Sequence, residues 1–257
     1  MEEFDDLVPT PDEDGGLELS YRGWAQIDDV VWTMGRELVS LNVSFNAIES
    51  LPPELGDLHL LRELNIACNK LQTLPKQIGK LRQLRVLKIN GNQIQSIPDD
   101  IGQCNHIERL YAGENRLPSF PATVENMKGL EILQLSNNDL TSIPPALCLI
   151  ETIKEIDLGN NPGLQHMIPS KLQDNTEFIL WMCDIWYNHQ KEVVLINQCN
   201  EAYSNSISRG ETKTKTLVNK VDRINTDTRD LLDEMPKGCL LKLAQCTASC
   251  KGSCSIM

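Results

Sequence analysis

The feature that most constrains the fold of this chain is an internal repeat with a period of 23 residues. Each unit ends in an asparagine that follows three apolar positions, as Leu61, Leu64 and Ile66 precede Asn69. The repeated residues are Asn46, Asn69, Asn92, Asn115, Asn138 and Asn161, and then Pro52, Pro75, Pro98, Pro121 and Pro144. A period of about 20 to 50 residues is typical of solenoids and propellers. One unit cannot bury its apolar face alone, so neighbouring units must stack.

Each unit predicts a short strand, a turn and a return segment. The alternation Leu64-x-Ile66 has a period of two, which indicates a brief strand with these side chains turned inward. Asparagine suits the following turn because its amide binds nearby backbone and because it tolerates unusual backbone angles. The proline six residues later prevents the strand from resuming. Segments such as PKQIGKL then return the chain along the outer face as irregular or short helical turns.

The segments LRELNIACNKLQTLPKQIGKL and LRVLKINGNQIQSIPDDIGQC resemble leucine-rich repeats of the form LxxLxLxxNxLxxLPxxIGxL. The resemblance covers residues 38–170 as six repeats, and the ending LPxxIGxL resembles the Ras-group subclass, found in Ras-pathway scaffolds and related intracellular plant proteins. It implies an α/β fold, a right-handed solenoid with a concave parallel β-sheet. The sixth repeat departs from the pattern because Pro169 lies eight residues after Asn161 instead of six. We expect its loop to bulge.

The two ends of a solenoid must be sealed against water. Residues 15–37 predict an N-terminal capping repeat that is one residue out of phase, and residues 171–199 predict a helical C-terminal cap. Four apolar residues share one face of this helix by their spacing, namely Phe178, Met182, Ile185 and Trp186. Ser170 with Gln173, or Asp174 with Glu177, could start it. All four tryptophans fall in the two caps, and we interpret them as core residues.

The remaining segments are polar or amphipathic. Residues 1–14 contain seven acids and no Lys or Arg, which predicts an acidic disordered tail, and residues 200–216 predict a polar linker. The net charge of −12 argues against a nucleic-acid partner, because no basic stripe is present to release counterions. Residues 217–235 predict an amphipathic helix with alternating four and three spacing. This helix either docks on the solenoid or forms a coiled-coil dimer.

The C-terminal residues 236–257 form a Cys/Lys-rich tail that predicts lipidation. Cys254 begins a C-a-a-X motif whose final methionine usually selects farnesyl. Stable anchoring needs a second signal, which palmitoylation of Cys250 and Cys246, with Cys239 as a weaker candidate, and three nearby lysines would supply. Zinc binding by Cys246, Cys250 and Cys254 is the alternative, but it lacks a fourth ligand at the usual spacing. We therefore expect the protein to be lipid-anchored at the cytoplasmic face of a membrane, and cytoplasmic if unmodified.

Signals for catalysis, secretion and membrane spanning are missing from the sequence. No apolar run approaches the ~20 residues of a membrane span, and no secretory signal begins the chain, so we expect an intracellular protein with free thiols. The glycosylation sequon at Asn42 is dismissed for the same reason. No P-loop, dinucleotide motif, paired metal-binding histidines or nucleophile elbow occurs. The prediction is a non-enzymatic protein with no cofactor, metal site, catalytic residue or small-molecule substrate.

A candidate partner-binding face follows from the outward positions of three successive central strands. These positions hold Val86 and Lys88, Arg109 and Tyr111, and Ile132 and Gln134, flanked by the acids Glu63, Glu155 and Asp157. Interface hot spots are enriched in Tyr and Arg near the centre of the contact, so Tyr111 and Arg109 are the best candidates. Lys88 would steer an acidic partner. The convex side and the termini also bind partners in repeat proteins and stay open as alternatives.

These features together predict a membrane-tethered protein–protein interaction scaffold or regulator. The Ras-group resemblance implies a place in small-GTPase signalling, where the partner would be a lipidated GTPase or its effectors. Two alternatives stay open at this point. The protein could be a regulatory subunit of a protein phosphatase, or a structural component of a membrane-bound organelle or cilium.

Overall fold

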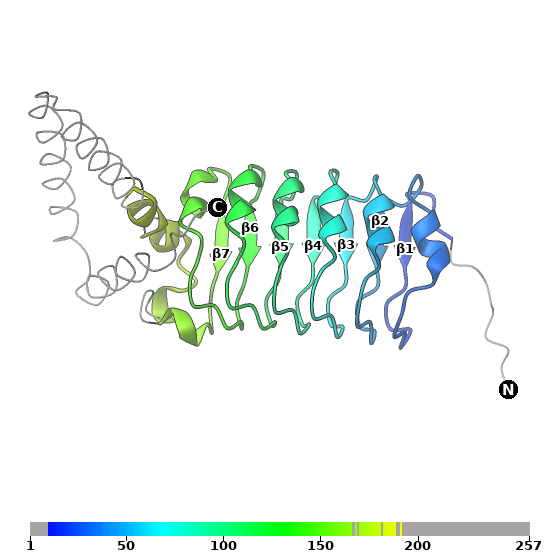
Figure 1. Ribbon diagram of the computed structural model, residues 1–257, viewed down its shortest axis with the longest axis horizontal. Helices are drawn as coiled ribbons and strands as arrows, with labels where there is room; N and C mark the ends of the chain where they lie inside the picture. Colours follow the sequence, from blue (N-terminus) through cyan, green and yellow to red (C-terminus); the bar gives the residue numbers. More distant parts are fainter. Residues whose placement is uncertain (1–9, 166–167, 169, 181, 189–190, 192–257) are drawn as a thin grey trace, which may run out of the picture. The chain divides into compact units, whose positions relative to one another are not determined.

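The computed structural model describes residues 10–165, 168, 170–180, 182–188 and 191. The chain divides into two compact units, residues 1–180 and 181–257, and the fold below is that of the first. Its seven strands form one open, parallel sheet in which the spatial order equals the chain order (Figure 1). The strands are β1 (Gly16–Glu18), β2 (Ser40–Asn42), β3 (Glu63–Asn65), β4 (Val86–Lys88), β5 (Arg109–Tyr111), β6 (Ile132–Gln134) and β7 (Glu155–Asp157). The predicted solenoid with a parallel sheet is confirmed.

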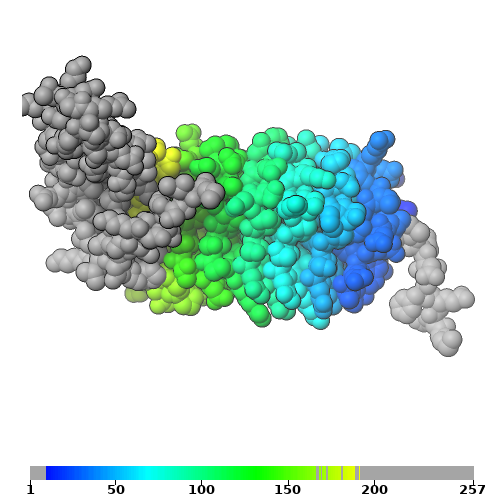
Figure 2. Space-filling model, in the orientation of Figure 1, coloured from blue at the N-terminus to red at the C-terminus, as the bar shows by residue number. Residues whose placement is uncertain are grey.

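The sheet register follows the sequence period. From β2 to β7 each residue pairs with the one 23 positions later, so that Leu64, Leu87 and Leu110 lie in one row. Between β1 and β2 the step is 24, as in the pairing of Gly16 with Ser40, so the first repeat is out of phase by one residue as the sequence predicts. The central residue of every strand is buried and its neighbours point outward. In the space-filling view the repeats follow one another along the unit without interruption (Figure 2).

Short 3-10 helices form a second row behind the strands (Figure 1). The regular ones are η2 (Pro53–Asp57), η3 (Lys76–Lys80), η4 (Asp99–Gln103), η5 (Ala122–Asn126) and η6 (Pro145–Leu149), and the others are η1 (Asp29–Thr33), η7 (Pro162–Leu164) and η8 (Ser170–Leu172). A repeated proline precedes each regular helix with φ between −59° and −77°, which the proline ring itself imposes. A Cβ at Gly79 would come within 2.5 Å of the Asp100 carbonyl oxygen, so this glycine permits the close helix stacking.

Five of the six repeated asparagines, from Asn69 to Asn161, are buried and join neighbouring repeats. Asn69 Nδ2 donates to the carbonyl oxygens of Val43 (3.0 Å) and Ile66 (3.1 Å), and its Oδ1 accepts from the backbone N–H of Ile48 (3.0 Å). The same pattern recurs at Asn92, Asn115, Asn138 and Asn161. Buried polar groups require such partners. The predicted hydrogen bonding of asparagine to backbone is confirmed, and it also ties each turn to the preceding repeat.

The unusual backbone angle of the turn belongs to a different residue from the one expected. The residue before each asparagine, and not the asparagine, adopts a positive φ of 55° to 68°. These residues are Phe45, Cys68, Gly91, Glu114, Asn137 and Asn160. The reversal of the chain therefore falls one residue before the asparagine whose side chain bonds to the backbone.

The last strand is closed by the segment that follows it. The backbone N–H of Leu158 donates to the Gln173 carbonyl oxygen (2.7 Å), and that of Ile156 donates to Thr176 Oγ1 (2.8 Å). Residues 176–180 are α-helical, and Asn175 Oδ1 accepts from the N–H of Phe178 (2.8 Å). The helix therefore begins after Asn175 and not at residue 171, and the starts predicted at Ser170 or Asp174 are wrong because Asn175 supplies the cap. Residues 182–188 are also helical, and the rest of the predicted cap lies outside the described residues.

The first strand is preceded by a turn. Asp12 Oδ1 accepts from the backbone N–H groups of Asp14 (3.0 Å) and Gly16 (2.7 Å), so residues 12–14 are ordered within the tail predicted to be disordered. Hydrogen bonds from the local backbone to the Asp12 carboxylate hold this segment in a turn. Residues 1–9, the linker 200–216, the amphipathic helix 217–235 and the tail 236–257 lie outside the described residues.

Candidate protein-interaction surface

The outward side chains of the sheet form a surface that we call the strand face. It consists of the first and third residues of each strand, which the register aligns in two rows across the sheet. The first row is Gly16, Ser40, Glu63, Val86, Arg109, Ile132 and Glu155, and the second row is Glu18, Asn42, Asn65, Lys88, Tyr111, Gln134 and Asp157. Acidic residues lie toward both ends of the rows, and the cationic, aromatic and aliphatic residues lie at the centre.

The six residues predicted as a partner-binding face lie side by side, and we call them the central patch. Val86 pairs in register with Arg109, which pairs with Ile132; Lys88, Tyr111 and Gln134 align in the second row. Arg109 is exposed and the other five are half-buried. The predicted adjacency is confirmed, while its use in binding stays a prediction. The half-buried aliphatic and aromatic side chains provide apolar contact area for a partner, and the exposed guanidinium at their centre provides a cation.

The charges of the central patch are unequally available. Lys88 Nζ lies 2.7 Å from Glu63 Oε1, so the neighbouring strand already partly neutralises the residue expected to steer an acidic partner. Gln134 Nε2 donates to Glu155 Oε1 at 3.2 Å. Within the part of the chain that the structure describes, the guanidinium of Arg109 has no hydrogen bond or ion pair. Arg109 is thus the cation of the patch best placed to receive an incoming carboxylate or phosphate.

Paired charges border the central patch along the residues that immediately precede the strands. Arg85 pairs with Glu108, and Lys154 Nζ lies 2.8 Å from Glu131 Oε1. Exposed ion pairs contribute only about 0 to 1 kcal/mol, so a partner can displace or rearrange them at low cost.

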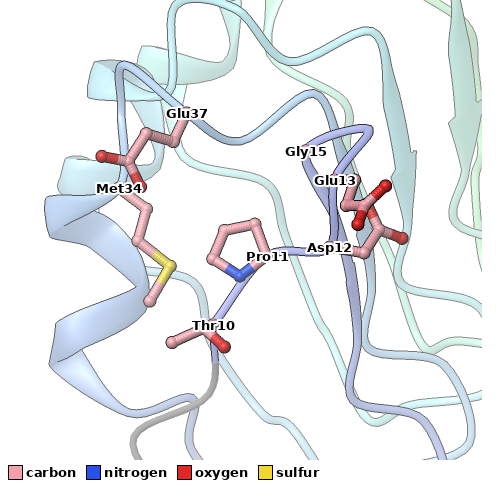
Figure 3. Close-up of a pocket in the computed structure, with 7 residues that line it drawn as sticks. All are labelled: Thr10, Pro11, Asp12, Glu13, Gly15, Met34 and Glu37. Atoms are coloured by element: carbon pink, nitrogen blue, oxygen red, sulfur yellow. The ribbon is translucent and has the colours of Figure 1, made fainter.

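A cavity near the N-terminus does not resemble an active site. It has a volume of about 420 Å³ and is lined by Thr10, Pro11, Asp12, Glu13, Gly15, Met34 and Glu37 (Figure 3). Its charged groups are all carboxylates, and Asp12 is occupied by the turn described above. Among the described residues, no group of three His, Cys, Asp or Glu could hold a metal ion. No helix in the same residues is long and apolar enough to cross a membrane.

Two of the described cysteines, Cys104 and Cys68, lie where burial disfavours the thiolate. Cys104 is buried, its Sγ donates to the Ile78 carbonyl oxygen at 3.1 Å, and burial raises the pKa of the thiol to about 12. Burial, together with the charge of Glu114, also raises the pKa of Cys68. Thiolates are the nucleophilic form of cysteine, so neither residue is activated at neutral pH. The predicted lipidation residues Cys239, Cys246, Cys250 and Cys254 lie outside the described residues.

The sequence reasoning missed an exposed aromatic pair. Tyr21 and Phe45 stack with their ring centroids 4.5 Å apart and their planes at 6°. They lie 24 residues apart, which equals the register step between β1 and β2. Aligning the out-of-phase first repeat on this step would have placed the two aromatic side chains beside each other.

Comparisons with known proteins identify the repeat region. Residues 41–166 match the family described as "Leucine-rich repeat region". A search of curated proteins found no match. The structure matches 312 solved chains. One is a leucine-rich-repeat protein of Leptospira interrogans, with 26% identity and a TM-score of 0.49 over 62% of this chain and 47% of that chain. A second is an internalin of Listeria monocytogenes, with 26% identity and a TM-score of 0.46 over 53% of this chain and 39% of that chain. A third is a TDR receptor, with 28% identity and a TM-score of 0.52 over 56% of this chain and 26% of that chain. The chain spans less than half of the length of each.

Proposed function

Because the chain contains a leucine-rich-repeat domain, we propose that it is a membrane-tethered scaffold whose strand face binds a protein in small-GTPase signalling. Leucine-rich-repeat domains are interaction modules, which supports a protein partner. The observation that carries the choice of site is the register. It sets Arg109, which is exposed and has no ion pair with another described residue, beside Tyr111 and between the aliphatic side chains of Val86 and Ile132. Arg and Tyr in the centre of a contact surface supply most of the binding energy in protein interfaces.

The electrostatics of the strand face support a partner that presents one acidic group to Arg109 and apolar side chains to the rest of the central patch. Glu155 and Asp157 on β7 flank the central patch and would repel a broadly acidic surface. A single carboxylate or phosphate aligned with Arg109 would avoid both, since a planar guanidinium forms two parallel hydrogen bonds with such a group. The specificity would therefore come from attraction at the centre and repulsion at this side.

The GTPase context rests on the LPxxIGxL endings and their resemblance to Ras-group repeats. The membrane tether rests on Cys254, with Cys250 and Cys246 as sites for a second lipid. Two proteins confined to one membrane meet at a higher effective concentration without any new contact. The tether would thus compensate for a modest affinity of the strand face.

The binding site is tested by capture from membrane extracts loaded with GTP or GDP. Wild type should retain a small GTPase or its effector in a nucleotide-dependent manner. Replacing Arg109 and Tyr111 together by Ala should weaken capture, and Tyr111→Ala alone should cost about 2 kcal/mol, or roughly 30-fold in Kd, if it is a hot spot. Arg116→Ala is the matched control, because Arg116 is exposed and lies outside the strand face. Wild-type binding by the double variant would place the site elsewhere.

The tether is tested separately by fractionation and mass spectrometry of the cellular protein. Cys254→Ser should move the protein to the soluble fraction, and replacing Cys246 and Cys250 by Ser should reduce membrane retention less completely. The proposal requires Met257 to be removed after prenylation. A C-terminal peptide that ends in unmodified Met257 would rule out the tether and leave the binding-site test unaffected.

A further inference from the structure

We propose that the Tyr21–Phe45 stack is a second docking site, which takes an arginine-bearing segment of a partner protein. The stack lies at the first repeats of the solenoid, at the turn that follows β1 and β2. It is separate from the central patch on β4, β5 and β6 and does not depend on the function proposed for that patch.

The exposure of the two rings is the first argument. Tyr21 is 72% exposed and Phe45 is 48% exposed, and the only other exposed large hydrophobic residue in the described part of the chain is Leu60 at 45%. Phe45 covers one face of the Tyr21 ring in a nearly parallel stack. β1 is the edge strand of the sheet, so no further repeat among the described residues covers the other face. An aromatic face of this kind is available to a planar ligand group.

The backbone at these positions gives an independent argument. Tyr21 and Phe45 adopt φ values of 58° and 55°, a left-handed conformation that bulky residues rarely adopt. Glycine and asparagine fill the same turn position at Gly91, Asn137 and Asn160. The turn therefore does not require an aromatic residue, and burial does not favour one where the ring stays in water. The turn geometry and the core therefore do not require two aromatic side chains here, and their stacking leaves one face of Tyr21 open to a partner.

The first repeat, which carries Tyr21, is acidic and therefore favours a cationic partner. Residues 10–35 contain six carboxylates and a single cation, Arg22. Glu18 lies in the strand that leads to Tyr21, where the Ser20 backbone N–H (2.9 Å) and Asn42 Nδ2 (2.6 Å) hold its carboxylate. Burial opposes ionisation of Glu18, but these hydrogen bonds, together with the positive charge of Arg22, outweigh it and lower its pKa, so the carboxylate stays charged at neutral pH.

Arginine satisfies both features of this surface better than lysine. Its guanidinium is planar and weakly hydrated, so it stacks on an aromatic face while its N–H groups reach a carboxylate. Lysine carries a compact, strongly hydrated charge that gains less from the ring. The ligand class is therefore an exposed arginine in a flexible or extended segment, with Tyr21 as the stacking surface and Glu18 as the counter-charge.

The test uses the full chain and the fluorescein-labelled peptide Gly-Arg-Gly-Arg-Gly, with its lysine and citrulline counterparts, in fluorescence anisotropy titrations at low salt. Replacing Tyr21 and Phe45 together by Leu keeps the net charge and removes the rings. This change should raise the Kd of the arginine peptide about fivefold, as expected for the loss of one exposed cation–π contact. Tyr21→Phe should bind as wild type. Leu60→Ser is the matched control for loss of an exposed apolar side chain and should also bind as wild type.

Three results would overturn the proposal. Equal binding of the arginine peptide by wild type and the Leu double variant would show that net charge alone attracts it. Equal binding of the citrulline and arginine peptides to wild type would show that the surface does not require a cation. A concentration-dependent dimer in sedimentation that the Leu double variant abolishes would assign the stack to contact between copies of the chain. Retained circular dichroism in both Leu and Phe variants ensures that each outcome reports on binding.

Discussion

The asparagine in the middle of the solenoid allows a quantitative test of how the repeats are held together. Asn92 is 8% exposed. Its Nδ2 donates to the carbonyl oxygens of Ile66 and Ile89, both at 3.0 Å, and its Oδ1 accepts from the backbone N–H of Leu71 at 3.0 Å. Asn92→Ala removes these three bonds and a longer one from Nδ2 to the Asn90 carbonyl oxygen (3.4 Å). It leaves one buried donor and two buried acceptors with lost partners, two of them in the preceding repeat.

The expected loss follows from these three groups. A hydrogen bond contributes about 1 kcal/mol net, and a buried group left without a partner costs about 1 to 3 kcal/mol. The Leu71 N–H has no second acceptor among the described residues, so it should bear the larger cost, while the carbonyl oxygens of Ile66 and Ile89 keep the bonds that they accept from Asn69 and Asn115. We expect Asn92→Ala to lower the free energy of unfolding by about 3 to 5 kcal/mol. This is a large part of the roughly 5 to 15 kcal/mol that stabilises a domain.

Urea denaturation followed by circular dichroism measures this loss, and hydrogen exchange locates it. The amide of Leu71 should lose protection in Asn92→Ala, because the repeats interact mainly with their nearest neighbours. Asn90→Ala is the matched control. Asn90 is half-buried, and its side chain makes no hydrogen bond within the described residues, so the change should cost less than about 0.5 kcal/mol. If the two variants unfold at the same urea concentration, the asparagine bonds do not hold the repeats together.

Three further outcomes follow from the structure. Glu114→Gly should stabilise the chain by up to about 1 kcal/mol in urea melts by relieving a φ of 55°, whereas Gly91→Ala should destabilise it because φ is 68° and the new Cβ would lie 3.1 Å from Cys68 Sγ. The folded-state pKa of Cys104 is about 12 and exceeds the ordinary value of 9.0, so the contribution of this thiol to stability is complete below pH 9 and is lost as the pH rises toward 12. A Cys104→Ala variant should therefore lack this part of the pH dependence of the free energy of unfolding. Alkylation of the native thiol should be slow at pH 8. Thr176→Val should cost about 1 to 3 kcal/mol and expose the Ile156 amide to hydrogen exchange, and unchanged exchange there would contradict the closing role of this segment.

The sequence by itself determined the repeating part of the molecule. The period of 23 residues fixed the number of regular strands, their parallel order, the buried central residue of each strand and the adjacency of Arg109 to Val86 and Ile132. This was possible because every repeat uses the same local contacts with its neighbours, so one translation generates the whole sheet. Even the offset of the first repeat was visible as a step of 24 instead of 23.

Only the tertiary structure decided the features that occur once. It paired Lys88, which the sequence predicts to steer an acidic partner, with Glu63, and it left Arg109 without a partner in the described chain. It also placed the left-handed residue before each asparagine and began the closing helix after Asn175. These outcomes depend on the lengths and rotamers of particular side chains meeting in space. A period carries no information about them, because it describes what the repeats share and not how two of them differ.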